Sequence, residues 1–465
     1  MSRYHIAARG LLGTLLVILA GSCGPPADER PNVIVLLVDT LRTDYLGSYG
    51  FPGEISPNLD RLASESVVFE NCYANAPWTP PSVGTLFTSL YPQVHGLNRF
   101  ADHKFRDPDS GKLRGSVLAD DAVTLAETLR DAGYSTAAFV ANPWLRSDLG
   151  LGQGFDLYDD SSVSKTVPAT LLTVAAREWI EERPRDRPFF LYLHFMDVHE
   201  PYESPREDFD AMWEGLFDAD ERLIDILPPK YLETRPSWAD DEMRKRLAYW
   251  RARYAAGVRL FDRRVAGLLG FLRESGLLDT SYLVLTSDHG EELYEHLGWG
   301  HGDSLHEHQL RVPLIVRPPQ PSSRRVANHV RLIDLMPTLL AVAGAEQPGG
   351  LQGVDVSGLL GGETLATPLP VYSTGIVDEP EVHSLIDGRY KLVVDLERDS
   401  PELYDLESDP EELENVASRE SVRVESMLER LELHIVETTA VELEQRTIEL
   451  PEELHESLRG LGYLD

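Results

Sequence analysis

The sequence predicts an α/β fold: a doubly wound, mostly parallel sheet flanked by helices, followed by a small C-terminal antiparallel sheet. Runs of apolar, β-branched residues alternate with amphipathic helical stretches, as in βαβ units. Two of these runs end in acidic residues, and open α/β sheets place their ligand chemistry at the carboxyl ends of strands. Near the C-terminus, Asp387-Gly388 predicts a hairpin turn.

The expected elements follow in chain order. A buried strand over 32–38 comes first and ends at Asp39, and Asp44 is expected to fix the turn that follows. The tracts 97–121 and 203–239 are expected to be loops or short elements that frame the site. The remaining expected elements are helices over 56–66, 124–134, 167–182 and 240–276, and strands over 67–75, 135–142, 282–286 and 312–316, with a further strand from Pro188 that ends in Asp197 and His199.

The first residues are typical of a targeting segment. A short basic region precedes about ten apolar residues, 11–20, and a membrane span needs ~20. The sequence LAGSC resembles a bacterial lipobox, so we expect a signal peptide over 1–23 that ends at a lipidated Cys23, with a plain secretory signal as the alternative. The anchor would hold the protein at the bacterial cell envelope, at the outer membrane if the host is Gram-negative. Cys72 is the other cysteine, so no disulfide framework is expected.

Length and composition are those of a globular enzyme with an unusual charge. The 465 residues are 42% hydrophobic and carry a net charge of -34. A sequence-independent nucleic-acid binder needs a basic surface, so the net charge argues against this class. We expect a linker over 24–30, a catalytic domain over 31–345, and a C-terminal subdomain over 346–465 that ends in an acidic helical tail over 412–465. The sequence does not indicate the oligomeric state.

The stretch WTPPSVGTLFTS, residues 78–89, contains a candidate nucleophile, Thr79. Threonine before proline is also a common helix cap, so Thr79 could merely cap a helix that starts at Pro80 or Pro81. The stretch resembles the signature of the sulfatases, in the alkaline phosphatase superfamily, where a Cys or Ser is oxidised to formylglycine. Thr79 stands at that position, and Val83 replaces an Arg that the modifying enzyme recognises. The resemblance therefore implies a sulfatase-like hydrolase in which no formylglycine is expected.

The same resemblance implies a metal site. Asp39 ends the first strand, although Thr40 follows it where sulfatases usually carry a second Asp. Asp288 and His289 end the strand over 282–286. Asp39, Asp288 and His289 would join Thr79 around one divalent ion, Ca, Mg, Mn or Zn.

Two histidines are expected to contact the substrate or to donate a proton, His199 and His301. With Asp197 they could instead form a second metal site, as in two-metal phosphatases of the superfamily. His194 lies five residues before His199 on an alternating strand and is expected to be buried for structural reasons. Three more histidines nearby are expected to be solvated: His296, His306 and His308. The sulfate-gripping Lys and His of sulfatases are absent, because residues 140–143 read VANP.

The chemistry of Thr79 favours a phosphoester substrate. A formylglycine hydrate expels sulfate by collapsing to an aldehyde, whereas a threonine ester must be cleaved by water, as phosphoryl-threonine intermediates are. We therefore expect a metal-dependent hydrolase of small-molecule or glycan esters, phosphate mono- or diesters before sulfate esters. A phospho-group transferase and a non-catalytic binding protein of the same fold are the alternatives.

Overall fold

The main sheet has eight strands in the order β11-β2-β10-β7-β1-β6-β4-β5. The computed structural model describes residues 29–98, 112–163, 167–202, 204–216, 241–375, 382–395, 400–441, 443–452, 454–455 and 458. The strands are β1 (Asn32–Val38), β2 (Val67–Tyr73), β4 (Ser135–Val140), β5 (Leu157–Asp159), β6 (Phe189–Phe195), β7 (Ser281–Thr286), β10 (Arg311–Arg317) and β11 (Arg324–Arg331). β10 runs antiparallel to its neighbours β2 and β7, and the other pairs are parallel. The predicted fold class is confirmed.

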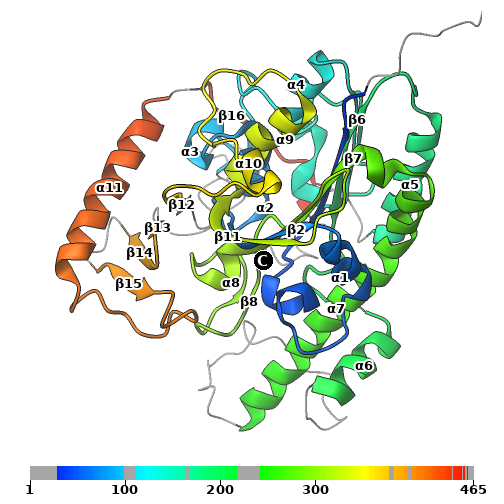
Figure 1. Cartoon of the computed structure of the whole chain (residues 1–465). Helices are drawn as coiled ribbons and strands as arrows, with labels where there is room; N and C mark the ends of the chain where they lie inside the picture. Colours follow the sequence, from blue (N-terminus) through cyan, green and yellow to red (C-terminus); the bar gives the residue numbers. More distant parts are fainter. Residues whose placement is uncertain are drawn as a thin grey trace, which may run out of the picture.

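Two apolar layers cover the sheet, because successive side chains of a strand point to opposite faces. Alternate residues of β1 pack with α2 (Thr79–Thr88), α4 (Leu125–Asp131) and α9 (Leu335–Ala343) on one face. The residues between them pack with α1 (Pro57–Ser64), α5 (Ala169–Glu182) and α7 (Asp241–Glu274) on the other. Figure 1 shows α5 and α7 together along one side of the sheet. The first face therefore carries α2 and, at its start, Thr79.

The C-terminal part forms a second, smaller sheet. Its strands are β12 (Val371–Thr374), β13 (Val382–Asp387), β14 (Tyr390–Asp395) and β15 (Glu402–Asp405), all antiparallel. The turn between β13 and β14 contains Gly388, whose φ of 62° suits glycine. α11 (Ser421–Thr439) packs on this sheet, and both lie at one end of the molecule in Figure 1.

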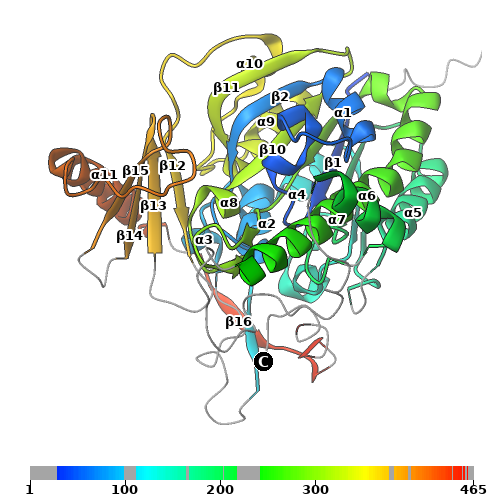
Figure 2. The ribbon, with the colours of Figure 1, turned by 90° about the horizontal axis from the view of Figure 1, so that it is seen from below.

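The tail after residue 412 is only partly helical, which corrects the predicted helical tail. α11 ends at Thr439, and β16 (Arg446–Glu449) then pairs with β3 (Arg114–Val117). This two-stranded ribbon extends away from the body in Figure 2. Acidic composition alone did not distinguish helix from strand here, because β16 forms through pairing with a distant segment.

No helix in the described part of the chain is long and apolar enough to cross a membrane. The predicted signal peptide, Cys23 and most of the linker lie outside the described residues, as does much of the two tracts that were expected to frame the site.

Candidate active site

Four predicted residues converge at the carboxyl end of the sheet. Asp39 follows β1, Asp288 and His289 follow β7, and Thr79 is the first residue of α2. Ligand atoms of Asp39, Asp288 and His289 all lie within 4.8 Å of one another. Thr79 Oγ1 lies 3.2 Å from His289 Nε2 and 3.4 Å from Asp39 Oδ2. Residues separated by up to 250 positions, Asp39 and His289, thus share one site because β1 and β7 are adjacent parallel strands.

Thr79 is not the helix cap. Trp78 occupies that position, and the Thr79 hydroxyl faces the acidic cluster. Pro80 and Pro81 follow and have no N–H, so the start of α2 offers few backbone donors to an anion. Asn142 supplies a donor instead: its Nδ2 lies 2.7 Å from Asp39 Oδ2 and 3.3 Å from Thr79 Oγ1.

Hydrogen bonds of Ser287 connect the turn after β1, which carries Asp39, with the turn after β7, which carries Asp288. The Ser287 hydroxyl lies 2.6 Å from the carbonyls of Val38 and of His289 and accepts from the Leu41 N–H. Thr40 has a φ of 59°, and its carbonyl accepts from the Tyr254 hydroxyl. Such a conformation is costly for threonine and persists where neighbouring contacts impose it.

The donor set fits a divalent cation. Asp39 Oδ1 and Asp288 Oδ2 are buried and make no hydrogen bond in the described structure. His289 Nδ1 donates to the Gly290 carbonyl at 2.9 Å, so in the neutral ring the Nε2 lone pair faces the carboxylates. Burial, followed by the charge of Asp288, raises the pKa of Asp39 to about 7. Among the described residues, no Lys or Arg pairs with either carboxylate. Two buried carboxylates need a compensating positive charge, which a metal ion would supply.

His199 and His301 lie beside this cluster. The His301 ring centroid is 4.5 Å from that of His289 and 4.9 Å from that of His199. His301 Nδ1 lies 3.0 Å from Glu291 Oε1, and His199 Nδ1 donates to the Glu200 carbonyl at 2.6 Å. Glu291 therefore orients His301, a role that the sequence analysis did not assign.

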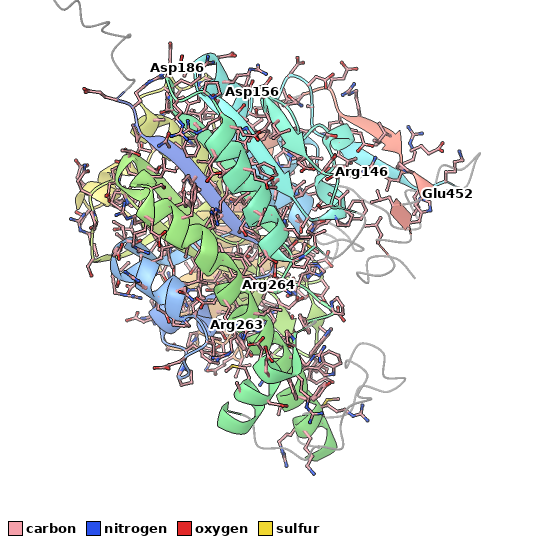
Figure 3. All side chains as sticks on the ribbon, turned by 90° about the vertical axis from the view of Figure 1, so that its right-hand side faces the viewer. Arg146, Asp156, Asp186, Arg263, Arg264 and Glu452 are labelled. Carbon is pink, nitrogen blue, oxygen red and sulfur yellow. The ribbon has the colours of Figure 1, made fainter. Side chains whose placement is uncertain are left out.

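The predicted second metal site does not form. The only ligand cluster of three or more that the described residues make is that of Asp39, Asp288 and His289. Asp197 Oδ1 accepts from Arg264 at 2.6 Å, and both carboxylate oxygens accept from the Ala169 N–H that begins α5. Figure 3 labels Arg264 on α7. Asp197 is thus used to join β6, α5 and α7, and the carboxylate is not available as a ligand beside His199.

Two further sequence predictions are corrected. His194 is buried as predicted, but it lies at the site: its Nε2 is 3.7 Å from Asp39 Oδ2 and 3.9 Å from Asp288 Oδ2. His296 and His306 are only partly exposed: their rings stack at a centroid distance of 3.8 Å, and His308 Nε2 pairs with Glu411 at 3.3 Å. The prediction for Asp44 stands, because this residue binds Arg42 through both oxygens.

Comparison with known proteins identifies the family of this chain. The sulfatase model matches residues 31–345, and the model for the C-terminal part of N-sulphoglucosamine sulphohydrolase matches residues 295–440. The chain belongs to the sulfatase family. It is therefore a sulfatase-family ester hydrolase, and members of this superfamily bind a divalent metal.

Relatives extend over most of the chain. N-acetylglucosamine-6-O-sulfatase of Bacteroides thetaiotaomicron is 25% identical, over 87% of this chain and 86% of that protein. Arylsulfatase K of Xenopus laevis is 26% identical, over 87% and 82%. Among solved structures, a protein in complex with its substrate D-glucosamine-2-N,6-O-disulfate is similar, with a TM-score of 0.72 at 22% identity. The match covers 88% of this chain and 98% of that protein's chain. The phosphonate monoester hydrolase of Agrobacterium radiobacter has a TM-score of 0.70 at 20% identity, covering 88% and 96%. These structures share the fold.

Proposed function

We propose that the chain is a metal-dependent hydrolase of phosphate mono- or diesters that uses Thr79 as its nucleophile. The observation that carries this proposal is the contact of the Thr79 hydroxyl with His289, Asp39 and Asn142. The sequence around Thr79 resembles the sulfatase signature, with Thr79 in place of the formylglycine. A threonine cannot form the aldehyde that releases sulfate. Its ester must be cleaved by water at the transferred atom, which phosphoryl-enzyme chemistry allows.

The reaction has two displacements. The Thr79 hydroxyl gives its proton to Asp39, to which it donates. Thr79 Oγ1 forms a bond to phosphorus while the bond to the ester oxygen breaks, and the departing alkoxide takes a proton from His199 or His301. Water then gives a proton to that histidine as it attacks phosphorus, and the bond from phosphorus to Thr79 Oγ1 breaks. Thr79 takes its proton back from Asp39, and the phosphate product is released. A divalent ion held by Asp39, Asp288 and His289 would lower the pKa of the nucleophile and neutralise charge on the transferred group.

His301 is the better placed acid because Glu291 orients it. A carboxylate beside Nδ1 fixes the tautomer and stabilises the protonated ring. Asn142 would donate from Nδ2 to an oxygen of the transferred group, in the role that lysine or histidine has in sulfatases.

A sulfate ester is the second candidate substrate. The relatives include two proteins named as sulfatases of amino sugars: N-acetylglucosamine-6-O-sulfatase of Bacteroides thetaiotaomicron and N-acetylgalactosamine-6-sulfatase of Canis lupus familiaris. Both candidate substrates could be esters of small molecules or glycans. They differ in the group that is transferred, which is phosphoryl in one case and sulfuryl in the other.

A substrate panel tests the proposal. Aryl phosphate, phosphodiester, phosphonate and sulfate esters are supplied with Zn, Mn, Ca or Mg, and Thr79 is checked by mass spectrometry. We expect phosphoester turnover above sulfate turnover with Thr79 unmodified. Faster aryl sulfate turnover with unmodified Thr79 would contradict the proposed chemistry. Transfer to an added alcohol in place of water would indicate a transferase, and metal binding without turnover would indicate a binding protein.

Substitution of the nucleophile gives the first testable prediction. Thr79→Ala should lower kcat by about 10⁴- to 10⁶-fold, as loss of a nucleophile does, while Thr79→Ser should retain part of the activity because it keeps the hydroxyl. Metal binding should survive in both variants, since two carboxylates and an imidazole remain. Equal activity in Thr79→Ala and Thr79→Ser would exclude Thr79 as the nucleophile.

We also propose that the protein is lipid-anchored at Cys23 in the bacterial envelope. The support is the lipobox-like LAGSC after a short apolar segment. Cys23→Ala should block processing or release the protein from the membrane fraction, which membrane fractionation and mass spectrometry of the N-terminus measure. Membrane retention with unchanged mass would argue against the anchor.

A further inference from the structure

The turn of residues 39–42, which we call the β1 turn, has an unusual backbone conformation directly beside the metal site. Thr40 follows Asp39 and has a φ of 59°. This left-handed conformation is costly for a β-branched residue such as threonine. Thr40 is fully buried, and its own hydroxyl makes no hydrogen bond in the described structure. The Thr40 side chain therefore does not stabilise the conformation, and another group has to.

The Tyr254 hydroxyl is in place to stabilise the β1 turn. It accepts a hydrogen bond from the Arg42 N–H at 2.8 Å and donates one to the Thr40 carbonyl at 2.6 Å. One hydroxyl thus lies between two backbone groups of the same short turn. Tyr254 is fully buried, and burial raises the pKa of its phenol well above the usual value. The hydroxyl therefore keeps the proton that it donates to Thr40.

The Tyr254 ring is held from outside the β1 turn. Tyr254 belongs to α7, which lies along one side of the sheet in Figure 1. The ring is edge-on to Tyr45 at a centroid distance of 4.6 Å and to Tyr202 at 5.7 Å. Closely packed interiors leave such a ring little freedom to move. The hydroxyl therefore has a fixed position relative to the sheet and can impose that position on the turn.

The place of the Asp39 carboxylate depends on the β1 turn. Its Oδ2 lies 3.4 Å from Thr79 Oγ1, and its Oδ1 lies 3.5 Å from His289 Nε2. The Asp39 N–H is bonded to the Phe195 carbonyl at 2.9 Å, so β6 fixes the residue on its amino side. Tyr254 fixes the chain on the carboxyl side. A displacement of about 1 Å in such a site can cost about 10²-fold in rate.

We propose that Tyr254 is a positioning residue of the metal site: its hydroxyl holds the β1 turn in its costly conformation and thereby places the Asp39 carboxylate for metal binding. Tyr254 acts through the backbone of Thr40 and Arg42 and is not itself a ligand. The inference rests on the proposed function of the metal site, to which it adds a residue of α7.

The metal affinity of Tyr254→Phe tests the proposal, because this variant keeps the ring and removes only the hydroxyl. Mn²⁺ and Zn²⁺, each added alone and followed by calorimetry, should bind about 10- to 100-fold more weakly than in the wild type, the usual effect of residues that orient metal ligands. In the metal-free protein, amide hydrogen exchange over residues 40–43 should become faster. Wild-type metal affinity in Tyr254→Phe would overturn the proposal.

Tyr134→Phe is the matched control. Tyr134 is similarly buried, and its hydroxyl donates to the carbonyls of Pro31, just before β1, and Ala343, at the end of α9. This variant also loses a buried hydrogen bond, so its stability should fall by a similar amount. Its metal affinity should stay that of the wild type. An equal loss of affinity in Tyr134→Phe and Tyr254→Phe would show a general effect of lost stability and would overturn the proposal.

Substitution of Thr40 tests whether Tyr254 acts on the conformation of the β1 turn. Glycine adopts a positive φ without steric cost and keeps the carbonyl, so Thr40→Gly alone should bind metal as the wild type does. Added to Tyr254→Phe, it should recover affinity by about 10-fold. A loss of affinity in Thr40→Gly alone, or no recovery in the double variant, would contradict the proposal. Faster turnover of sulfate than of phosphate esters would contradict the proposed substrate only, since metal affinity is measured without substrate.

Discussion

At the residue scale, site residues that belong to a local motif could be predicted from the sequence. Those whose role depends on contacts with distant parts of the chain could not. Asp39, Thr79, Asp288 and His289 were recognisable because each follows a strand or precedes a helix within a local motif. The burial of His194 was predicted but its place beside Asp39 and Asp288 was not, since strand alternation cannot be counted to His199 once β6 ends at Phe195.

Asn142 and Glu291 were missed for a different reason. Their roles depend on groups far away in the chain or across a loop: Asn142 on Asp39 and Thr79, and Glu291 on His301. No local spacing encodes these contacts. The one available signal was the replacement of the sulfatase lysine and histidine by VANP.

Asn142 gives a prediction at this scale. Asn142→Ala should lower kcat about 10²- to 10³-fold, the usual effect of losing a donor to developing charge. Asn142→Asp keeps the oxygen that accepts from the Trp144 N–H, but it places a charge beside Asp39 and loses the donor, so it should not restore activity. Steady-state kinetics with the best phosphoester measure this, and circular dichroism checks the fold. An active Asn142→Asp variant would show that the donor is dispensable.

At the scale of elements, the loops after β1 and β7 form one unit around Arg42. The guanidinium binds Asp44 and Glu295 and donates to the Glu291 carbonyl. Gly290, in the loop after β7, packs directly against α8 (Glu307–Leu310). A side-chain Cβ at this position would lie only 2.0 Å from the carbonyl oxygen of His308, so the close packing requires glycine. The strands and helices were predictable from periodicity and apolar runs. The packing of α8 against the turn after β7, which carries Asp288 and His289, could not be predicted, because it depends on the order of strands in the sheet.

The histidines around α8 should make the fold sensitive to acid. Burial, followed by His296 and Lys391, lowers the pKa of His306 to about 2, and burial and Arg42 lower that of His308 to about 4. The unfolded chain binds protons at these residues below about pH 6.5, while the folded protein does not. The free energy of unfolding should therefore fall as the pH drops from about 6.5 towards 4.

The variant His306→Phe tests this dependence. It keeps an aromatic ring against His296 and removes the titrating group, so the pH slope of the unfolding free energy should be smaller by about one proton. Urea unfolding at several pH values measures the slope, with His434→Phe, which changes a histidine of α11, as a comparison for a separate site. An unchanged slope would mean that His306 is protonated in the folded state.

For the whole molecule, a buried ionic group joins the catalytic domain to the small sheet. Lys391 of β14 is fully buried and lies 3.2 Å from Glu307 of α8 and 2.8 Å from Glu412. Glu412 also accepts from the Glu307 N–H. α8 also packs against Gly290, in the turn that carries Asp288 and His289. The small sheet therefore contacts the active site indirectly, through Lys391, Glu307 and α8.

Lys391→Met should destabilise the protein by about 3–5 kcal/mol, because two buried carboxylates lose their cation. The double variant Lys391→Met with Glu412→Gln should recover part of this loss, since one carboxylate is then neutral. Chemical unfolding measures both, and metal affinity should fall alongside stability. Equal stability of the wild type and Lys391→Met would show that the carboxyls take up protons at no cost.

The pairing of β16 with β3 has a consequence for synthesis of the protein. Arg114 of β3 contacts Thr447 of β16 across 333 positions. At about 5–20 residues per second, a ribosome needs roughly 20–70 s to make the chain between them. During that interval β3 has no partner strand, and an open strand edge invites pairing with other chains. Nascent or truncated chains that lack the last twenty or so residues would therefore be the ones that most need a chaperone.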